Sequence, residues 1–169
     1  MHAEQLQFLL DDFFQFTLAA AVQHGPLVYA VEEEHRQPVR DWLRHRIDKL
    51  WPTYAVWVSE RQHLDNIQKL AGGLAEAHGD LLHNQIFTIG RAQKVLNLYL
   101  KYLWCAHIIK RAPPHCPFDN LILQHLGWNH GWHALNTMQE YEKIVGLARA
   151  NANGVELAQW ELVLFNHRP

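Results

Sequence analysis

One uninterrupted helical pattern, residues 88–110 (TIGRAQKVLNLYLKYLWCAHIIK), constrains the fold more than any other part of the chain. Almost all of its side chains are apolar, and they cover most directions around a helix axis instead of a single stripe. A helix that is apolar on most faces is normally buried inside its domain. We therefore predict a central buried helix over about residues 89–109, with other helices packed around it.

Three polar residues, Lys94, Asn97 and Lys101, interrupt this apolar pattern. At about 100° per residue they fall within roughly 60° of one another around the helix, so they form one polar stripe. Burial of an ammonium group is unfavourable unless the charge is paired. The polar stripe is therefore expected to face water, a carboxylate or a ligand.

Apolar residues recur at three- and four-residue steps elsewhere in the chain, which predicts about seven helices in all. The segments besides the central one are about residues 4–23, 38–51, 60–78, 118–126, 137–154 and 156–165. The second of these is expected to end before Pro52, and residues 54–58 alternate as a strand would, although no partner strand is evident. A chain of 169 residues is long enough for one ordinary domain, so we predict a single all-α domain over residues 1–169.

The formal net charge of −2 gives no strong overall attraction for nucleic acid or for an anionic membrane. Residues 81–118, however, contain no Asp or Glu and five basic residues, so this segment carries a local positive field. No apolar run approaches the roughly 18 residues of a transmembrane helix, and no membrane partner is expected. The start of the chain lacks a basic segment followed by an apolar one, and two cysteines are too few for a disulfide framework. These features favour a cytoplasmic location.

Asp119 follows a proline-rich connector, residues 112–117, that turns the chain back after the central helix. We expect this turn to bring Asp119 to the polar stripe, where it can pair with a lysine. A lysine that is partly desolvated beside another cation has a lowered pKa, and its free amine is a nucleophile. The alternative is that Lys94 and Lys101 mark the solvated edge of the helix while Asp119 only caps a helix N-terminus.

The order of these residues carries a resemblance to a known family. Gly90 lies in the first turn of the central helix, Lys94 and Lys101 follow two turns apart, and Asp119 stands in the segment PFDNLI that starts the next helix. Residues 88–126 thereby resemble the catalytic core of the helix-hairpin-helix DNA glycosylase superfamily, the archaeal 8-oxoguanine glycosylase branch in particular. That family is all-α, which agrees with the helical pattern.

The resemblance implies that Lys94 is a Schiff-base nucleophile and that Asp119 is its activating carboxylate. It also implies that Arg91 and the amides near Gly90 hold a phosphate of duplex DNA, and it implies no cofactor. The chain departs from the family in lacking the first glycine of the Gly-x-Gly turn, in the position of Lys94, and in the longer gap to Asp119. Two hypotheses stay open: a DNA glycosylase-like protein, with an active or a degenerate site, and a non-enzymatic helical binding or assembly module.

Two further groups of residues have more than one interpretation. Trp128 and Trp132 flank an expected loop, where they could stack on a base or belong to the core or an interface. The second group could hold Zn²⁺ or consist of loop histidines stacked on tryptophans: His115, Cys116, His125, His130 and His133. No H-E-x-x-H or paired C-x-x-C pattern supports a zinc site, so no metal is predicted.

Overall fold

The central buried helix is present as α4, Ile89–Cys105. The computed structural model describes residues 2–23 and 28–167, apart from the side chain of Gln23. Within these residues it is an all-α domain whose seven α-helices are joined by turns and short 3₁₀ or π segments, which confirms the predicted fold class. The other helices are α1 (Ala3–Leu18), α2 (Gln37–Val56), α3 (Glu60–His78), α5 (Asn120–His125), α6 (Met138–Ala152) and α7 (Leu157–Asn166).

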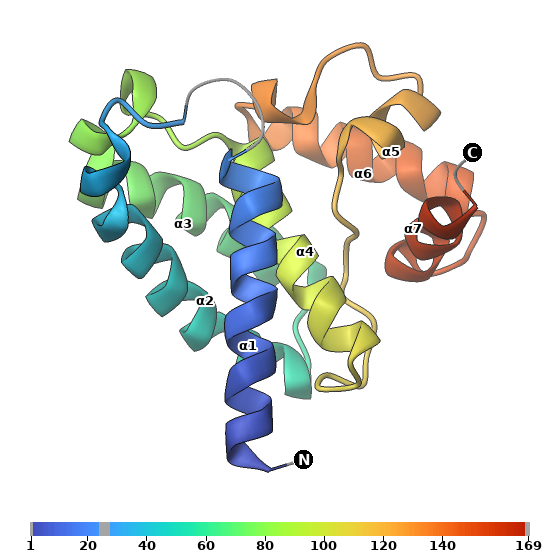
Figure 1. The fold of residues 1–169 in the computed structure, drawn as a ribbon. Coiled ribbons are helices and arrows are strands. Elements are labelled where there is room, and N and C mark those ends of the chain that lie inside the picture. Colours follow the sequence, from blue (N-terminus) through green and yellow to red (C-terminus); the bar gives the residue numbers. More distant parts are fainter. Residues whose placement is uncertain (1, 24–27, 168–169) are drawn as a thin grey trace.

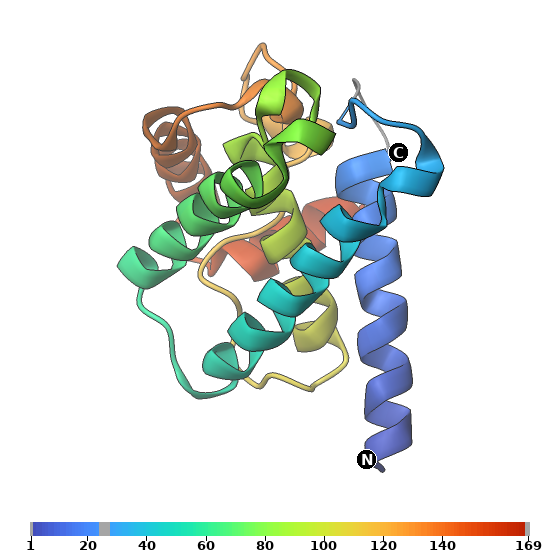
Figure 2. The same ribbon diagram turned by 90° about the vertical axis from the view of Figure 1, so that its left-hand side faces the viewer.

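The remaining helices surround α4. Figure 1 shows α1 crossing in front of α4, with α2 and α3 on one side of it and α5, α6 and α7 on the other. In the view turned by 90°, α2 and α3 lie side by side in front of α4 (Figure 2), and α1 and α3 both contact α4. Among the described residues, none of the helices is both long enough and apolar enough to cross a bilayer.

The central helix ends earlier than the sequence pattern predicts, at Cys105 instead of about residue 109. His107 adopts a left-handed conformation with φ 58°, which breaks the helical path. The amides of Ile108 and Ile109 then donate to the carbonyl oxygen of Leu103, at 2.9 and 3.3 Å. Ile109 turns back into the core through this bend, so its apolar character reflects burial and not helix continuation.

The prediction that the second helix ends before Pro52 is wrong, because α2 continues through this proline to Val56. A proline inside a helix removes one backbone donor and costs about 3 kcal/mol, which tertiary contacts can offset. Here the last turn carries Tyr54, whose side chain is buried and whose hydroxyl lies 2.8 Å from Nδ1 of His63. The strand considered for residues 54–58 is therefore absent.

Gly90 brings the first turn of α4 against the 3₁₀ helix Trp132–Ala134. A Cβ atom at this position would overlap the carbonyl oxygen of Trp132 and lie 2.8 Å from its carbonyl carbon. The amide of Gly90 donates to the carbonyl oxygen of Leu135 at 2.9 Å, which fixes the same approach. The glycine thus serves a backbone-to-backbone contact.

Replacing Gly90 by alanine is expected to lower the free energy of unfolding by about 1–3 kcal/mol, because the added methyl group must displace backbone. Gly146 in the middle of α6 is the matched control, since a Cβ atom added there would meet no described atom within 4 Å. Gly146→Ala should be neutral or stabilising by up to about 1 kcal/mol through helix propensity. Urea unfolding of both variants tests this, and equal stabilities would contradict the close contact at Gly90.

Candidate functional site

Lys94 lies in the second turn of α4 and is half-buried. Its Nζ atom stands 4.1 Å from the centroid of the Trp132 ring, a cation–π contact. Burial lowers the pKa of the Lys94 amine, and the charge of Asp119 opposes this effect. The amine therefore has a larger neutral fraction than a surface lysine at the same pH.

Asp119 is the N-cap of α5, where its Oδ1 accepts a hydrogen bond from the amide of Ile122 at 3.2 Å. Its place relative to α4 is set by Gln93, the residue before Lys94. The Gln93 side chain donates to the carbonyl oxygen of Phe118 at 2.9 Å and accepts from the Phe118 amide at 3.2 Å. This two-point clamp holds the residue before Asp119 against the residue before Lys94.

The structure thus brings Lys94 and Asp119 within electrostatic reach of each other. Among the ion pairs of the described residues, however, these two side chains do not make a direct one. Sequence reasoning did not select Gln93, because a glutamine on an apolar helix has no spacing that marks it as a backbone clamp.

The residues expected to hold phosphate are engaged inside the fold. The amide of Gly90 donates to Leu135, and the amide of Arg91 donates to the hydroxyl of Thr88 at 3.2 Å. The Arg91 side chain is buried, its guanidinium lies 3.4 Å from the carbonyl oxygen of Ala21, and burial lowers its pKa. These groups stabilise the N-terminus of α4 in the structure.

The polar stripe divides into three environments. Lys94 faces Trp132, Asn97 is completely buried in a hydrogen-bond network, and Lys101 pairs with Glu161 of α7 at 2.7 Å. The expectation that the polar stripe faces a carboxylate is met at Lys101, but this carboxylate belongs to Glu161 and not to Asp119.

The two candidate stacking tryptophans differ in exposure. Trp132 is buried beneath Lys94 and Arg91, so it belongs to the core in this structure. Trp128 is half-buried, and its indole Nε1 has no hydrogen-bond partner among the described atoms. Of the two, Trp128 is the one that presents part of its ring to solvent.

The histidines considered for zinc do not assemble. His115 and Cys116 are buried in the core, whereas His125 and His130 are exposed. Within residues 2–23 and 28–167, no three His, Cys, Asp or Glu side chains are arranged to hold a metal ion.

A hydrogen-bond network that sequence reasoning missed runs through the core beside α4, and we call it the buried histidine network. Its members, in order of contact, are Asn66, Tyr54, His63, Asn97, Tyr141, His115, Glu60 and Arg149. They come from α2, α3, α4, α6 and the proline-rich connector. Because partners such as Glu60 and His115 are 55 residues apart in the chain, no local motif reveals them.

The donors in the first half of the buried histidine network follow from Asn97. Its Nδ2 donates to the carbonyl oxygen of Cys116 at 2.9 Å, so its Oδ1 faces His63 and can only accept, also at 2.9 Å. Nε2 of His63 must therefore carry the hydrogen, and Nδ1 accepts from the hydroxyl of Tyr54. Both ring nitrogens are satisfied by a neutral imidazole.

Hydrogen bonds in the second half of the buried histidine network are also donated in the direction from Asn66 toward Glu60. Nδ2 of Asn97 lies 3.1 Å from the Tyr141 hydroxyl, which donates to Nδ1 of His115 at 2.8 Å. Nε2–H of His115 then faces Oε1 of Glu60 at 3.4 Å, and Oε2 of Glu60 pairs with Arg149 at 2.7 Å. Burial lowers the pKa of His115 to about 3 and that of His63 well below its ordinary value. Both rings are neutral at pH 7.

Comparison with known proteins adds no relative. No protein-family model matches the chain, and neither a curated protein nor a solved structure matches it. The function of the chain is therefore inferred from the geometry of the site itself.

Proposed function

We propose that the chain is a DNA-acting protein with a glycosylase-like site formed by Lys94 and Asp119. The observation that carries the proposal is a half-buried amine of lowered pKa, held within electrostatic reach of an aspartate by the Gln93 clamp. A nucleophilic lysine needs a neutral fraction, and a nearby carboxylate can accept its proton and stabilise positive charge on a sugar. The order of the two residues along α4 and α5 supports the same reaction class.

In the proposed reaction, a bond forms between Nζ of Lys94 and C1′ of a deoxynucleotide while the bond from C1′ to the base breaks. The electron pair of the broken bond leaves with the base, which takes up a proton from water. The attacking amine gives its proton to the Asp119 carboxylate. When the bond from C1′ to O4′ breaks, Asp119 passes this proton to O4′, and the electron pair on nitrogen forms the C=N bond of a protonated imine on Lys94. Duplex DNA is the proposed partner, and the two free thiols, Cys105 and Cys116, are compatible with the cytoplasm.

Borohydride trapping is expected to link the protein covalently to a duplex that carries a susceptible lesion, with 8-oxoguanine as the first substrate. Lys94→Ala should abolish the adduct, because the amine forms the trapped bond. Asp119→Asn should reduce its rate at least tenfold while keeping the cap on α5, since asparagine caps as well as aspartate. Lys143→Ala, an exposed lysine on α6, is the control and should trap normally. An adduct that persists in Lys94→Ala would refute the assignment.

The second candidate is a non-enzymatic helical binding or assembly module, and the Lys101–Glu161 pair favours it. In this pair, one cation of the polar stripe is already bound by a carboxylate of the same chain. Under this alternative, Lys94→Met is stably folded, no lesion gives an adduct, and DNA binding is absent or removed by modest salt. A salt titration of DNA binding by the unmodified protein separates the two.

A further inference from the structure

A groove lies at the opposite end of α4 from Lys94, where the chain leaves the helix and enters the proline-rich connector. Its volume is about 680 Å³, within the range of about 300–1,000 Å³ that small-molecule sites occupy. The lining residues that bear on recognition are Trp57, Trp104, Glu60, Lys110, Arg111 and Glu156. Trp104 and Lys94 are ten residues apart on one helix, so the groove lies about 15 Å along the axis from the proposed catalytic lysine.

The aromatic wall of the groove is open to solvent. Trp57, the first residue beyond α2, is 61% exposed and makes no aromatic pair among the described residues. Trp104 of α4 also lines the groove and is half-buried. A large indole left in water beside a concave surface is the arrangement that stacks on a flat ring.

The charged residues of the groove favour an anionic ligand that also carries hydrogen-bond donors. Lys110 and Arg111 are exposed neighbours, and neither has an ion pair within the described part of the chain. The carboxylate of Glu60 is already compensated by Arg149 and faces Nε2–H of His115. Glu156 is the remaining carboxylate of the lining. The groove therefore has two cations, Lys110 and Arg111, and one carboxylate without a counter-charge among the described residues.

We propose that this groove binds a nucleoside phosphate unit, with the base stacked on Trp57 and the phosphate held by Lys110 and Arg111. Adjacent guanidinium and ammonium groups suit phosphate oxygens, which accept several charged hydrogen bonds at once. The carboxylate oxygens of Glu60 and Glu156 can accept from an exocyclic amino group, which favours adenine over thymine. The unit can come from a free nucleotide or from single-stranded nucleic acid. This site goes beyond the proposed function and does not require chemistry at Lys94.

Isothermal titration at low salt with AMP, and with an oligodeoxyadenylate of about eight nucleotides, tests the proposal. Trp57→Ala is expected to weaken binding about tenfold by removing the stacking platform, and Lys110→Ser/Arg111→Ser should weaken it at least as much. The matched controls are Val56→Ala, which removes an apolar side chain that is 77% exposed beside Trp57, and Lys143→Ser. Both controls should bind as the unmodified protein does.

The two ligands separate the two sources. If AMP binds as tightly as the oligomer does per bound nucleotide unit, the natural ligand is a free nucleotide. If only the oligomer binds, the natural ligand is single-stranded nucleic acid. Absence of binding to both, or binding that neither the Trp57 variant nor the double variant weakens, overturns the proposal. Should Trp57→Ala alter the thermal unfolding profile, the double variant decides, since both of its side chains are exposed. Lys94→Ala should bind AMP normally, so failure of borohydride trapping and failure of the groove are distinguishable.

Discussion

Lowering the pH from 7 to 5 is expected to reduce the free energy of unfolding by about 4 kcal/mol, because two imidazoles are buried in their neutral form. His63 and His115 are both inaccessible to solvent, and their rings meet edge to face with centroids 4.7 Å apart. Burial is the main cause of the lowered pKa of each histidine. The His115 ring lowers the pKa of His63 further, and the charge of Arg149 lowers the pKa of His115 further. Protonation of either would place a charge inside the core.

Proton linkage explains why the free energy of unfolding decreases as the pH falls. Histidines in the unfolded chain bind protons below a pKa of about 6.5, whereas folded His115 binds one only near its pKa of about 3. The unfolded state therefore takes up more protons as the pH falls, so the stability present above pH 6.5 is lost progressively below it. Each such histidine contributes about 2 kcal/mol of loss between pH 7 and pH 5.

The polar and charged groups that surround the two rings determine whether the pH dependence of unfolding can be assigned to these histidines. Tyr54 and Asn97 face His63, while Tyr141, Glu60 and Arg149 face or lie near His115. Measurements from pH 8 to pH 5 stay above the range in which most carboxyl groups titrate.

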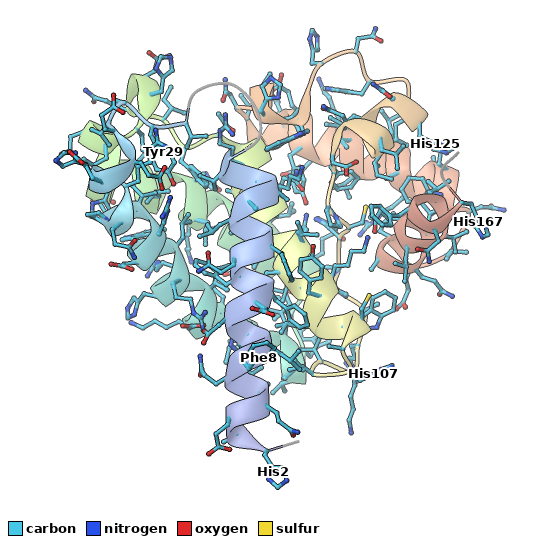
Figure 3. All side chains as sticks on the ribbon, viewed as in Figure 1. His2, Phe8, Tyr29, His107, His125 and His167 are labelled. Atoms are coloured by element: carbon cyan, nitrogen blue, oxygen red, sulfur yellow. The ribbon has the colours of Figure 1, made fainter. Side chains whose placement is uncertain are left out.

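Urea unfolding at several pH values should show a slope approaching two protons near pH 5 in the unmodified protein. His63→Gln and His115→Gln should each remove about one proton from this slope, whatever their effect on absolute stability. His167→Gln is the control, because His167 is exposed at the edge of the molecule (Figure 3), as are His2, His107 and His125. A slope unchanged in both buried-histidine variants would contradict the neutral burial.

The parts of the site that could be predicted from the sequence are those set by local signals. Asp119 caps α5 and Thr88 caps α4, as residues with a short oxygen-bearing side chain before a helix do. The mostly apolar pattern of α4 correctly indicated a central helix, because a helix that is buried on most sides has apolar residues in every turn.

The parts that could not be predicted depend on contacts between distant segments. Lys101 and its partner Glu161 are 60 residues apart, and His63 and Asn97 are 34 apart. A helical wheel placed Asn97 and Lys101 on one stripe, but it cannot tell which neighbouring helix each side chain meets. Packing gave them different partners, so a single stripe became a buried amide, a buried ion pair and a half-buried amine.

Replacing Lys101 by methionine is expected to lower the free energy of unfolding by about 3–5 kcal/mol, because it leaves the carboxylate of Glu161 buried without a counter-charge. Lys101 is 8% exposed and Glu161 is 2% exposed, and Nζ lies 2.7 and 2.8 Å from the two carboxylate oxygens. The same ammonium stands 4.4 Å from the centroid of the Phe165 ring, which also shields it from water. The methionine keeps most of the volume of the lysine stem, so the effect reports the charge.

A double-mutant cycle gives the control for this prediction. Lys101→Met/Glu161→Leu should be more stable than either single variant and lie within about 2 kcal/mol of the unmodified protein, since removing both charges leaves none to compensate. Burial already raises the pKa of Glu161, and loss of the ammonium removes the main influence that lowers it. The deficit of Lys101→Met relative to the unmodified protein should therefore shrink between pH 7 and pH 5, as Glu161 becomes protonated in the folded variant. Additive effects of the two substitutions, or a deficit independent of pH, would show that the pair is not coupled in the core.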